Sequence, residues 1–491
     1  MIEIKNVSFS YQGNDGAAGL HGIDLTIKTG ECVLLCGKSG CGKTTVTRLL
    51  NGMIPNFYEG ELTGEVLLDG ENILNRPMYA ISKKVGTVFQ NPRTQFYTVN
   101  TTSEIAFGCE NFGLPREEIA ARVRQTARDL QIEPLLNRNI FGLSGGEKQI
   151  IAFAGVYALS PEVYVLDEPS SNLDVQAIEK IRVLLALLKK QGKTIVIAEH
   201  RTYYLKDLAD RAVYLEQGKI VREYTMQELA AITPAQQMET GIRTVDLLRY
   251  PITPAAPVPG GDTLQVENLR FSYGKAEALH IDRLELPAGL ITAIIGTNGA
   301  GKSTLVSCLC GLLKHAKGSI TLGGEKIPPK ERLRKSYLVM QEVNHQLFSD
   351  SVREEIVLGA KDPAEGRLQA IAEELNLTPL YERHPMTLSG GQKQRVILAS
   401  AMFCGKRILF FDEPTSGLDY CHMQKTCALL KGLQDQDTFL FIITHDYEMI
   451  ASVCDSVVHI EQGKLKEQYP LEGEGTQKLR NFFAQSMKHT I

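Results

Sequence analysis

GKSGCGKT occupies residues 37–44 of the chain, and GTNGAGKS occupies residues 296–303. Each follows a short apolar run typical of a strand and precedes a run typical of a helix. In that context, glycines let backbone N–H groups curl around phosphate, and the positive end of the helix dipole adds to the attraction. Lys43 and Lys302 are then expected to reach the outer phosphates. The two stretches predict two phosphate-binding loops on α/β domains.

Other motifs of the chain also occur twice. LSGGEKQ at residue 143 recurs as LSGGQKQR at 388, and VYVLDEPSSNLD recurs as ILFFDEPTSGLD, both 245 positions later. His200 and His445 are separated by the same 245 positions, and each ends a β-branched apolar run. The front halves match less rigidly, since Gln90 and Gln341 differ by 251. Self-similarity on this scale predicts one module that occurs twice.

Length and composition fit two globular domains. The chain has 491 residues, 22% of them charged, and a net charge of -4, which disfavours broad nucleic-acid binding. No apolar run approaches the roughly 18 residues needed to cross a bilayer. The N-terminus has no signal-peptide pattern, so we expect the chain to stay in the cytoplasm. The ten cysteines show no CxxC pair, and we expect reduced, mostly buried thiols.

We place the domain boundaries by composition. Residues 1–231 and 262–491 form the two expected domains, and residues 232–261, which include PITPAAPVPGG, read as a linker. Alternating short strands and helical stretches predict a mainly parallel sheet covered by helices in each copy. Residues 112–138 and 364–383 are helix-rich and charged, and we interpret them as part of a helical subdomain inserted between the phosphate loop and the LSGG motif of each copy.

Two adjacent carboxylates end a buried strand in each copy, where α/β sheets bind ligands. We expect Asp167 and Asp412 to bind Mg²⁺, and Glu168 and Glu413 to act as a base or orienter for attacking water. The alternative is that one carboxylate only caps the next turn. His200 and His445 are candidates to contact the γ-phosphate, or they are polar residues at a loop start; their matched spacing favours the first interpretation. The full set of expected metal ligands is Thr44, Gln90, Asp167, Ser303, Gln341 and Asp412.

LSGG before an amphipathic helix offers a hydroxyl and backbone N–H groups as a second anion site in each copy. Read alone, it is an ordinary capping box, with serine at the N-cap and Glu or Gln three residues on. Tyr11 and Tyr273 are candidates to stack on adenine, or they only pack the first sheet. The expected nucleotide-binding residues are Tyr11, Gly37, Lys38, Ser39, Gly40, Cys41, Gly42, Lys43, Thr44, Thr45, Gln90, Ser144, Gly145, Gly146 and Glu147 in the first copy. Those of the second copy are Tyr273, Gly296, Thr297, Asn298, Gly299, Ala300, Gly301, Lys302, Ser303, Thr304, Gln341, Ser389, Gly390, Gly391 and Gln392.

In this order, the motifs resemble the nucleotide-binding domains of ABC ATPases, twice and over nearly the whole chain. The resemblance implies two tandem P-loop domains, each with an antiparallel β subdomain and an inserted helical subdomain, and it implies ATP and Mg²⁺ as cofactors. It further implies an intramolecular head-to-tail pairing, in which the LSGG of one copy completes the nucleotide site of the other. The first signature departs from the pattern with Glu147 where glutamine is commoner. No departure removes a catalytic carboxylate, histidine or lysine, so both sites look competent.

A closer likeness comes from FQNPRTQF, AFGCENFGLP, EHR at 199–201 and MQEVNHQLFSDSVREE. These look like energy-coupling factor importers, whose ATPases work with a membrane scaffold and a substrate-capturing membrane protein for vitamins or transition metals. That resemblance implies a peripheral protein at the cytoplasmic face of the cell membrane, with no nucleic-acid partner. The rival hypothesis is a soluble tandem ABC protein acting on ribosomes or nucleic acid, which the short proline-rich linker and the acidic chain disfavour.

Two further expectations concern single residues. Cys41 lies inside the first phosphate loop where the second has Ala300, so it is either a thiol that distinguishes the two sites or a buried, inert one. Glu104 and Glu355 occupy equivalent places after the Q-loops. Either they pair with arginines of the membrane scaffold, or they are only helix starts.

Overall fold

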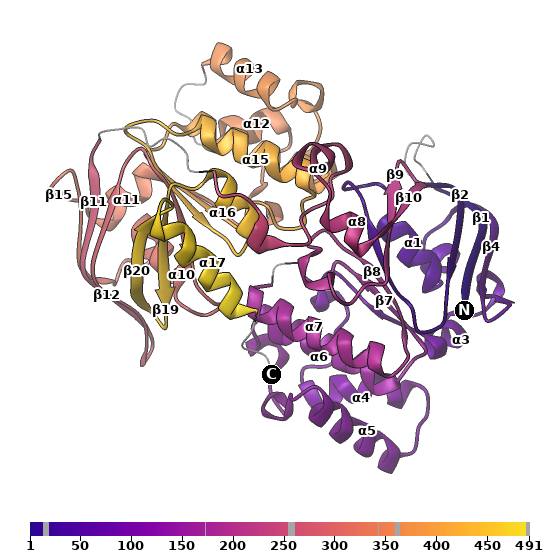
Figure 1. Ribbon diagram of the computed structural model, residues 1–491. Helices are drawn as coiled ribbons and strands as arrows, with labels where there is room; N and C mark the ends of the chain where they lie inside the picture. The colour runs from indigo at the N-terminus through magenta and orange to yellow at the C-terminus, as the bar shows by residue number, and fades with distance from the viewer. Residues whose placement is uncertain (13–18, 172, 254–260, 342, 359–363, 488–491) are drawn as a thin grey trace. The chain divides into compact units, whose positions relative to one another are not determined.

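The computed structural model describes all residues except 13–18, 172, 254–260, 342, 359–363 and 488–491. The chain divides into two compact units (Figure 1). Unit 1 comprises residues 1–249, 417–421 and 486–491, and unit 2 comprises residues 250–416 and 422–485. Among the described residues, no helix combines the length and the apolar character that a membrane span requires.

Unit 1 contains an antiparallel sheet and a mainly parallel one. The antiparallel sheet has the order β2-β1-β4-β5, and the second sheet has the order β10-β9-β3-β8-β7-β6 with β10 as its antiparallel edge. The central strands β3, β7 and β8 are apolar along almost their whole length, as expected for strands covered on both faces. The strands are β1 (Ile2–Tyr11), β2 (Gly19–Ile27), β3 (Cys32–Cys36), β4 (Gly60–Leu68), β5 (Glu71–Asn72), β6 (Val85–Val88), β7 (Val163–Asp167), β8 (Thr194–Ala198), β9 (Arg211–Glu216) and β10 (Lys219–Thr225).

The helices of unit 1 cover this second sheet and form the expected helical insertion. The inserted helices α4 and α5 pack on α6 and share the apolar core beneath it. The helices are α1 (Lys43–Leu50), α2 (Met53–Asn56), α3 (Met78–Lys84), α4 (Thr101–Asn111), α5 (Arg116–Asp129), α6 (Gly145–Leu159), α7 (Val175–Lys190), α8 (Met226–Ala230) and α9 (Pro234–Thr240).

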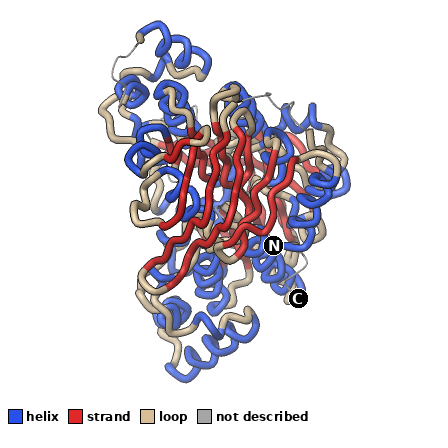
Figure 2. Tube along the Cα trace, turned by 90° about the vertical axis from the view of Figure 1, so that its left-hand side faces the viewer, coloured by secondary structure: helices blue, strands red, loops and turns tan. Residues whose placement is uncertain are grey.

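Unit 2 repeats the architecture with its two sheets joined into one. The order is β15-β14-β11-β12-β20-β19-β13-β18-β17-β16, and the two parts meet at a single pairing between His280 and Lys464. Figure 2 draws the strands in red, running side by side with helices around them. The strands are β11 (Thr263–Tyr273), β12 (Ala276–Pro287), β13 (Ile291–Ile295), β14 (Lys317–Leu322), β15 (Glu325–Lys326), β16 (Ser336–Val339), β17 (Ile408–Asp412), β18 (Phe439–Ile443), β19 (Ser456–Glu461) and β20 (Lys464–Pro470).

The helices of unit 2 follow a similar order, and unit 2 ends in a longer helix than the one that follows β10 in unit 1. The last helix, α17, places Phe483 against Tyr447, with ring centroids 5.1 Å apart, at the start of the helix that follows His445. The helices are α10 (Lys302–Cys310), α11 (Pro329–Lys335), α12 (Val352–Val357), α13 (Glu365–Glu374), α14 (Gly390–Cys404), α15 (Tyr420–Gly432), α16 (Tyr447–Val453) and α17 (Glu474–Ser486).

The segment expected as a linker, residues 232–261, is ordered in its first part. Thr233 and Gln236 form a capping box that starts α9, and Pro234 stands at its first position. Residues Ile242 and Val245 are buried in the core of unit 1. The Thr202 hydroxyl donates to the carbonyl oxygen of Arg243 at 2.9 Å. The proline-rich stretch at 254–260 lies outside the described residues.

Candidate functional site

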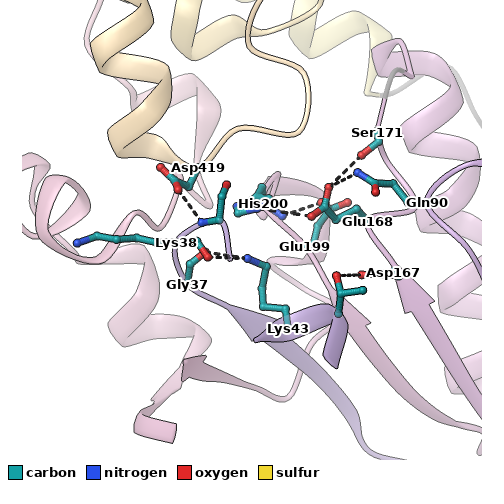
Figure 3. Close-up of polar contacts among 12 residues, drawn as sticks. Gly37, Lys38, Lys43, Gln90, Asp167, Glu168, Ser171, Glu199, His200 and Asp419 are labelled. Atoms are coloured by element: carbon teal, nitrogen blue, oxygen red, sulfur yellow. Dashed lines mark hydrogen bonds and ion pairs between the residues drawn. The ribbon is translucent and has the colours of Figure 1, made fainter. Parts of the chain in front are cut away.

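The first phosphate loop joins β3 to α1 and is built around Gly37. Gly37 has φ of 140°, and a Cβ there would lie 2.2 Å from the carbonyl oxygen of Leu215, so no other residue fits. The Lys43 ammonium donates to the carbonyl oxygens of Gly37 at 3.0 Å and Lys38 at 3.1 Å (Figure 3). Ser39 and Gly40, at the loop tip, are exposed. The lysine is therefore held inside a loop whose tip is exposed, although the backbone N–H of Ser39 donates to Asp419 Oδ2 at 2.7 Å (Figure 3).

The second phosphate loop repeats this geometry between β13 and α10. Gly296 has φ of 147°, and a Cβ there would lie 2.1 Å from the carbonyl oxygen of Ile460. The Lys302 ammonium donates to the carbonyl oxygens of Gly296 at 2.7 Å and Thr297 at 2.9 Å. Both predicted loops thus have the same fold around a buried lysine.

A hydroxyl and a carboxylate meet beside the first loop. The Thr44 hydroxyl donates to Asp167 Oδ1 at 3.1 Å, and burial raises the pKa of Asp167 against the opposing effect of Thr44. In unit 2, burial raises the pKa of Asp412 to about 6, opposed by Lys302. Oxygen ligands of this kind suit Mg²⁺, so these residues fit the ion that the sequence predicts.

Glu168 follows β7 in the left-handed backbone region, with φ of 43°. Its Oε2 accepts hydrogen bonds from Gln90 Nε2 at 2.7 Å and from the Ser171 hydroxyl at 3.3 Å, and His200 Nε2 lies 3.6 Å from Oε1 (Figure 3). Burial, followed by the charge of Glu199, raises the pKa of Glu168 to about 8. The predicted Gln90, Glu168 and His200 are thus brought together in one place.

Glu413 repeats the backbone conformation, with φ of 49°, and two groups at the end of β18 donate to its carboxylate. The Thr444 hydroxyl donates to Oε2 at 3.0 Å, and the backbone N–H of His445 donates to Oε1 at 3.0 Å. The ring Nε2 of His445 lies 3.8 Å from Oε1. Left-handed backbone at a non-glycine residue costs of order 1–3 kcal/mol, and both glutamates share it with matched turn residues of the two copies, such as Gln217 and Gln462.

Both LSGG motifs form the capping box that the sequence allowed as an alternative. Ser144 caps α6 with Glu147 at its third position, and Ser389 caps α14 with Gln392. Burial and the Ser144 contacts act in opposite directions on Glu147, whose pKa is lowered overall. Gly145, Gly390 and Gly391 have open space around them. A capping box and an anion site are compatible, because the backbone N–H groups of the glycines still point out of the helix start.

The two tyrosines expected to stack on adenine, Tyr11 and Tyr273, have different surroundings. The hydroxyl of Tyr11 is 3.1 Å from that of Thr45 and accepts from Arg48 at 2.9 Å, while the Arg48 guanidinium lies over the ring of Tyr58 at 4.0 Å. Tyr273 is 57% exposed and packs edge-on against Phe271. Tyr11 is therefore tied into a cluster with Arg48, and Tyr273 is the more open ring.

Cys41 is buried, and burial raises the pKa of its thiol against the opposing effect of Lys43. A buried thiol with a raised pKa holds little of the reactive thiolate at neutral pH. The structure therefore favours the inert alternative for Cys41.

The structure favours the helix-start alternative for Glu104 and Glu355 over pairing with a partner's arginine. Both side chains are buried, and their carboxylates accept hydrogen bonds from the backbone of the preceding loop. Glu104 accepts from the N–H and hydroxyl of Thr98 at 2.8 and 2.9 Å, and Glu355 accepts from the N–H groups of Phe348 and Ser349 at 2.8 Å each. The carboxylates fasten the loop to the helix, so they are not presented to another protein.

Sequence reasoning missed Glu199, which the structure places at the centre of the first site. Its side chain is 2% exposed, and it accepts from the N–H groups of Ser170 at 3.2 Å and His200 at 2.7 Å and from the Tyr204 hydroxyl at 2.8 Å. The signal that could have found it is the pairing of EHR with THD at the 245-residue offset, which sets Glu199 against Thr444.

Comparison with known proteins gives the family. The family model described as "ABC transporter" matches residues 20–171 and 279–416. The chain belongs to the ABC transporter family.

This ABC ATPase is similar to proteins of the same length and organisation. It is 47% identical to a Treponema denticola protein named as an ABC transporter ATP-binding protein, over 95% of this chain and 96% of the relative. It is 31% identical to a Bacillus subtilis protein named as an HMP/thiamine import ATP-binding protein, over 93% of this chain and 89% of the relative. A structure of the archaeal ribosome recycling factor aABCE1 covers 98% of this chain and 92% of its own, with a TM-score of 0.66 and 20% identity. That last likeness establishes the shared fold.

The chain is thus an ATP-binding component with tandem ABC domains, and its enzymatic activity is ATP hydrolysis. The fold predicted from sequence is confirmed: an α/β P-loop fold with a mainly parallel sheet, an antiparallel β subdomain and an inserted helical subdomain in each copy.

Proposed function

We propose that the chain is the ATP-hydrolysing motor of an energy-coupling factor type importer, and that it powers uptake of a vitamin or transition-metal ion through separate membrane subunits. The observation that carries the proposal is the likeness over nearly the whole chain to a protein named for HMP/thiamine import. That likeness favours the vitamin class. The partners are then an integral membrane scaffold and a substrate-capturing membrane subunit, with this chain bound peripherally at the cytoplasmic face.

We assign the chemistry of each site by its contacts. The loops around Lys43 and Lys302 bind the ATP phosphates, and the Thr44–Asp167 pair is the centre of the proposed Mg²⁺ site, to which we also assign Gln90, the partner of Glu168. Ser303, Asp412 and Gln341 have the same roles in unit 2. When bound, Mg²⁺ neutralises charge on the outer phosphates. Glu168 and Glu413 orient the attacking water, and each lies within 4 Å of the histidine that we assign to the γ-phosphate.

We further propose that the two halves pair head-to-tail, so that Ser389–Gln392 complete the nucleotide site at Lys43 and Ser144–Glu147 complete the site at Lys302. This is supported by the presence in each unit of two separate anion-binding elements, a phosphate loop and a signature helix start.

This chain has another candidate surface for docking of the membrane scaffold, which we propose in place of Glu104 and Glu355. Tyr97 and Phe348 occupy equivalent positions, 251 residues apart, and are 75% and 76% exposed. Tyr97 stacks on Phe107 at 4.9 Å, and Leu358, the equivalent of Phe107, is also exposed. The backbones of Tyr97 and Phe348 are fixed by Glu104 and Glu355, so each ring is presented from an anchored loop. Aromatic rings on fixed backbone are the usual anchors of protein interfaces.

Co-purification with neighbouring membrane proteins tests the proposal. Tyr97→Glu and Phe348→Glu are expected to reduce recovery of the membrane scaffold at least about tenfold, since hot-spot residues cost about 2 kcal/mol or more. Val221→Glu, at a 57% exposed site on β10, is the matched control and should co-purify normally. Recovery of ribosomes in place of membrane proteins would contradict the importer proposal and support the rival.

The catalytic assignment is tested separately. Glu168→Gln and Glu413→Gln are each expected to slow ATP turnover of the assembled complex by about 10²- to 10⁴-fold at the affected site. If Glu413→Gln leaves the rate unchanged, unit 2 does not hydrolyse ATP.

A further inference from the structure

The two hydrolytic glutamates are held by donors from different parts of the fold. Thr444 and the N–H of His445, at the end of β18, both donate to Glu413. In unit 1 the residue before the histidine is an acid, and the N–H of His200 donates to Glu199. Glu168 instead accepts from Gln90 and Ser171, which lie on loops.

The acidic residue next to the histidine precedes it in one copy and follows it in the other. In unit 1 it is Glu199, before the histidine, and Arg201 follows the histidine. In unit 2 it is Asp446, after the histidine, and it accepts from the Thr415 hydroxyl at 2.7 Å. Thr415 is the equivalent of Ser170, so both acids bind the same point of the loop that follows the Asp-Glu pair.

The different position of the acid leaves one buried hydroxyl of unit 1 without a hydrogen-bond partner in the described part of the chain. The Ser170 hydroxyl is buried and has no hydrogen-bond partner among the described residues, while its counterpart in unit 2 donates to Asp446. A buried polar group without a partner costs free energy. Glu199 therefore binds the backbone of Ser170 and leaves its hydroxyl without an acceptor within the described chain, which an acid after the histidine could supply.

We propose that Glu199 is a positioning residue that draws the backbone N–H of His200 away from Glu168, so that the first hydrolytic carboxylate depends on Gln90 for its orientation. Thr444 does the opposite in unit 2 and fixes Glu413 from the strand end. A carboxylate oriented by the Q-loop is set for reaction only when that loop is in place, whereas a carboxylate oriented by its own strand is set beforehand. This inference rests on the proposed role of Glu168 and Glu413.

The test exchanges the two arrangements in the full chain, assembled with its membrane partners. Glu199→Thr/Arg201→Asp gives unit 1 the residues of unit 2, and the new aspartate can accept from Ser170. ATPase kcat and KM are measured for this variant with and without Gln90→Ala. We expect Gln90→Ala to lower kcat at least about fivefold less in the exchanged chain than in the wild type, with KM changed less than about twofold. Any loss of Mg²⁺ binding caused by Gln90→Ala is common to both backgrounds and cancels in the comparison.

The reciprocal variant, Thr444→Glu/Asp446→Arg, removes a hydrogen-bond donor to Glu413 and should lower kcat at the second site. Glu179→Thr/Arg182→Asp is the matched control, because Glu179 is also buried and paired to an arginine, but on α7. It should leave the effect of Gln90→Ala as in the wild type.

Equal effects of Gln90→Ala in the wild-type and exchanged chains would overturn the inference, and so would a change confined to KM. Failure of the proposed function has a different result: Glu168→Gln then leaves kcat unchanged, which removes the basis of the inference as well.

Discussion

Removing the Glu104 carboxylate is expected to release the loop before α4 even when no membrane protein is present. Its Oε2 accepts three hydrogen bonds, from the N–H of Tyr97 at 3.2 Å and from the N–H and hydroxyl of Thr98 at 2.8 and 2.9 Å. In Glu104→Ala the hydroxyl can turn to another acceptor, but the two backbone N–H groups cannot. Each group left without its acceptor costs about 1–3 kcal/mol, and water entering the site recovers part of this, so the loop loses roughly 2–4 kcal/mol of local stability.

Hydrogen exchange of the full chain measures this loss directly. At about 1.4 kcal/mol per factor of ten, the amides of Tyr97 and Thr98 should exchange roughly 30- to 800-fold faster in Glu104→Ala. Glu110→Ala is the control, since Glu110 is exposed on the same helix, and it should leave these amides unchanged. The reasoning is refuted if Glu104→Ala leaves the exchange of both amides unchanged while it reduces co-purification with the scaffold. The glutamate would then be a docking contact.

Three further predictions concern the first and second sites. Gly37→Ala and Gly296→Ala should each weaken ATP binding more than about tenfold at the affected loop, because a Cβ would lie 2.2 or 2.1 Å from a carbonyl oxygen; Gly142→Ala, with open space around it, should bind ATP normally in the same titration. Cys41 should resist maleimide in the folded chain and react after denaturation, and rapid labelling of the native protein at Cys41 would show that its thiol is accessible after all. In the nucleotide-free and metal-free chain, the raised pKa of Glu168 means that the unfolded state loses this proton first, so the wild type loses stability as pH rises from 4.5 toward 8. Glu168→Gln lacks this titration, so its melting temperature relative to the wild type should increase across that range, and a constant difference would contradict the burial argument.

The sequence predicted the repeat, the two phosphate loops and the helical insertion because these depend on local features. Glycine spacing, an apolar strand and a following helix act within about a dozen residues, and the structure forms them as expected at Gly37 and Gly296. The same is true of the signature helices, where Ser144 and Ser389 begin a helix by capping.

The features of the site that could not be predicted from the sequence depend on which side chains become buried in the folded chain. A glutamate in the first turn of a helix has the same pattern whether its carboxylate points outward or, as in Glu104, back onto the preceding loop. Glu199 likewise gains its role only because Ser170 and Tyr204, from separate segments, converge on it in the folded chain. Residues 242–247 lack helical or strand periodicity, and their burial against the core of unit 1 follows from tertiary contacts alone.

The left-handed backbone at Glu168 and Glu413 bears on the history of the repeat. Glycine or asparagine would adopt this conformation at lower cost, so in a copy that had stopped hydrolysing ATP, mutation at this position would tend to increase stability and would meet no opposition from selection. Duplicated domains are free to diverge in this way once one of them is dispensable. On the proposed role of the two glutamates, each half therefore keeps a residue that lowers its stability for the sake of hydrolysis.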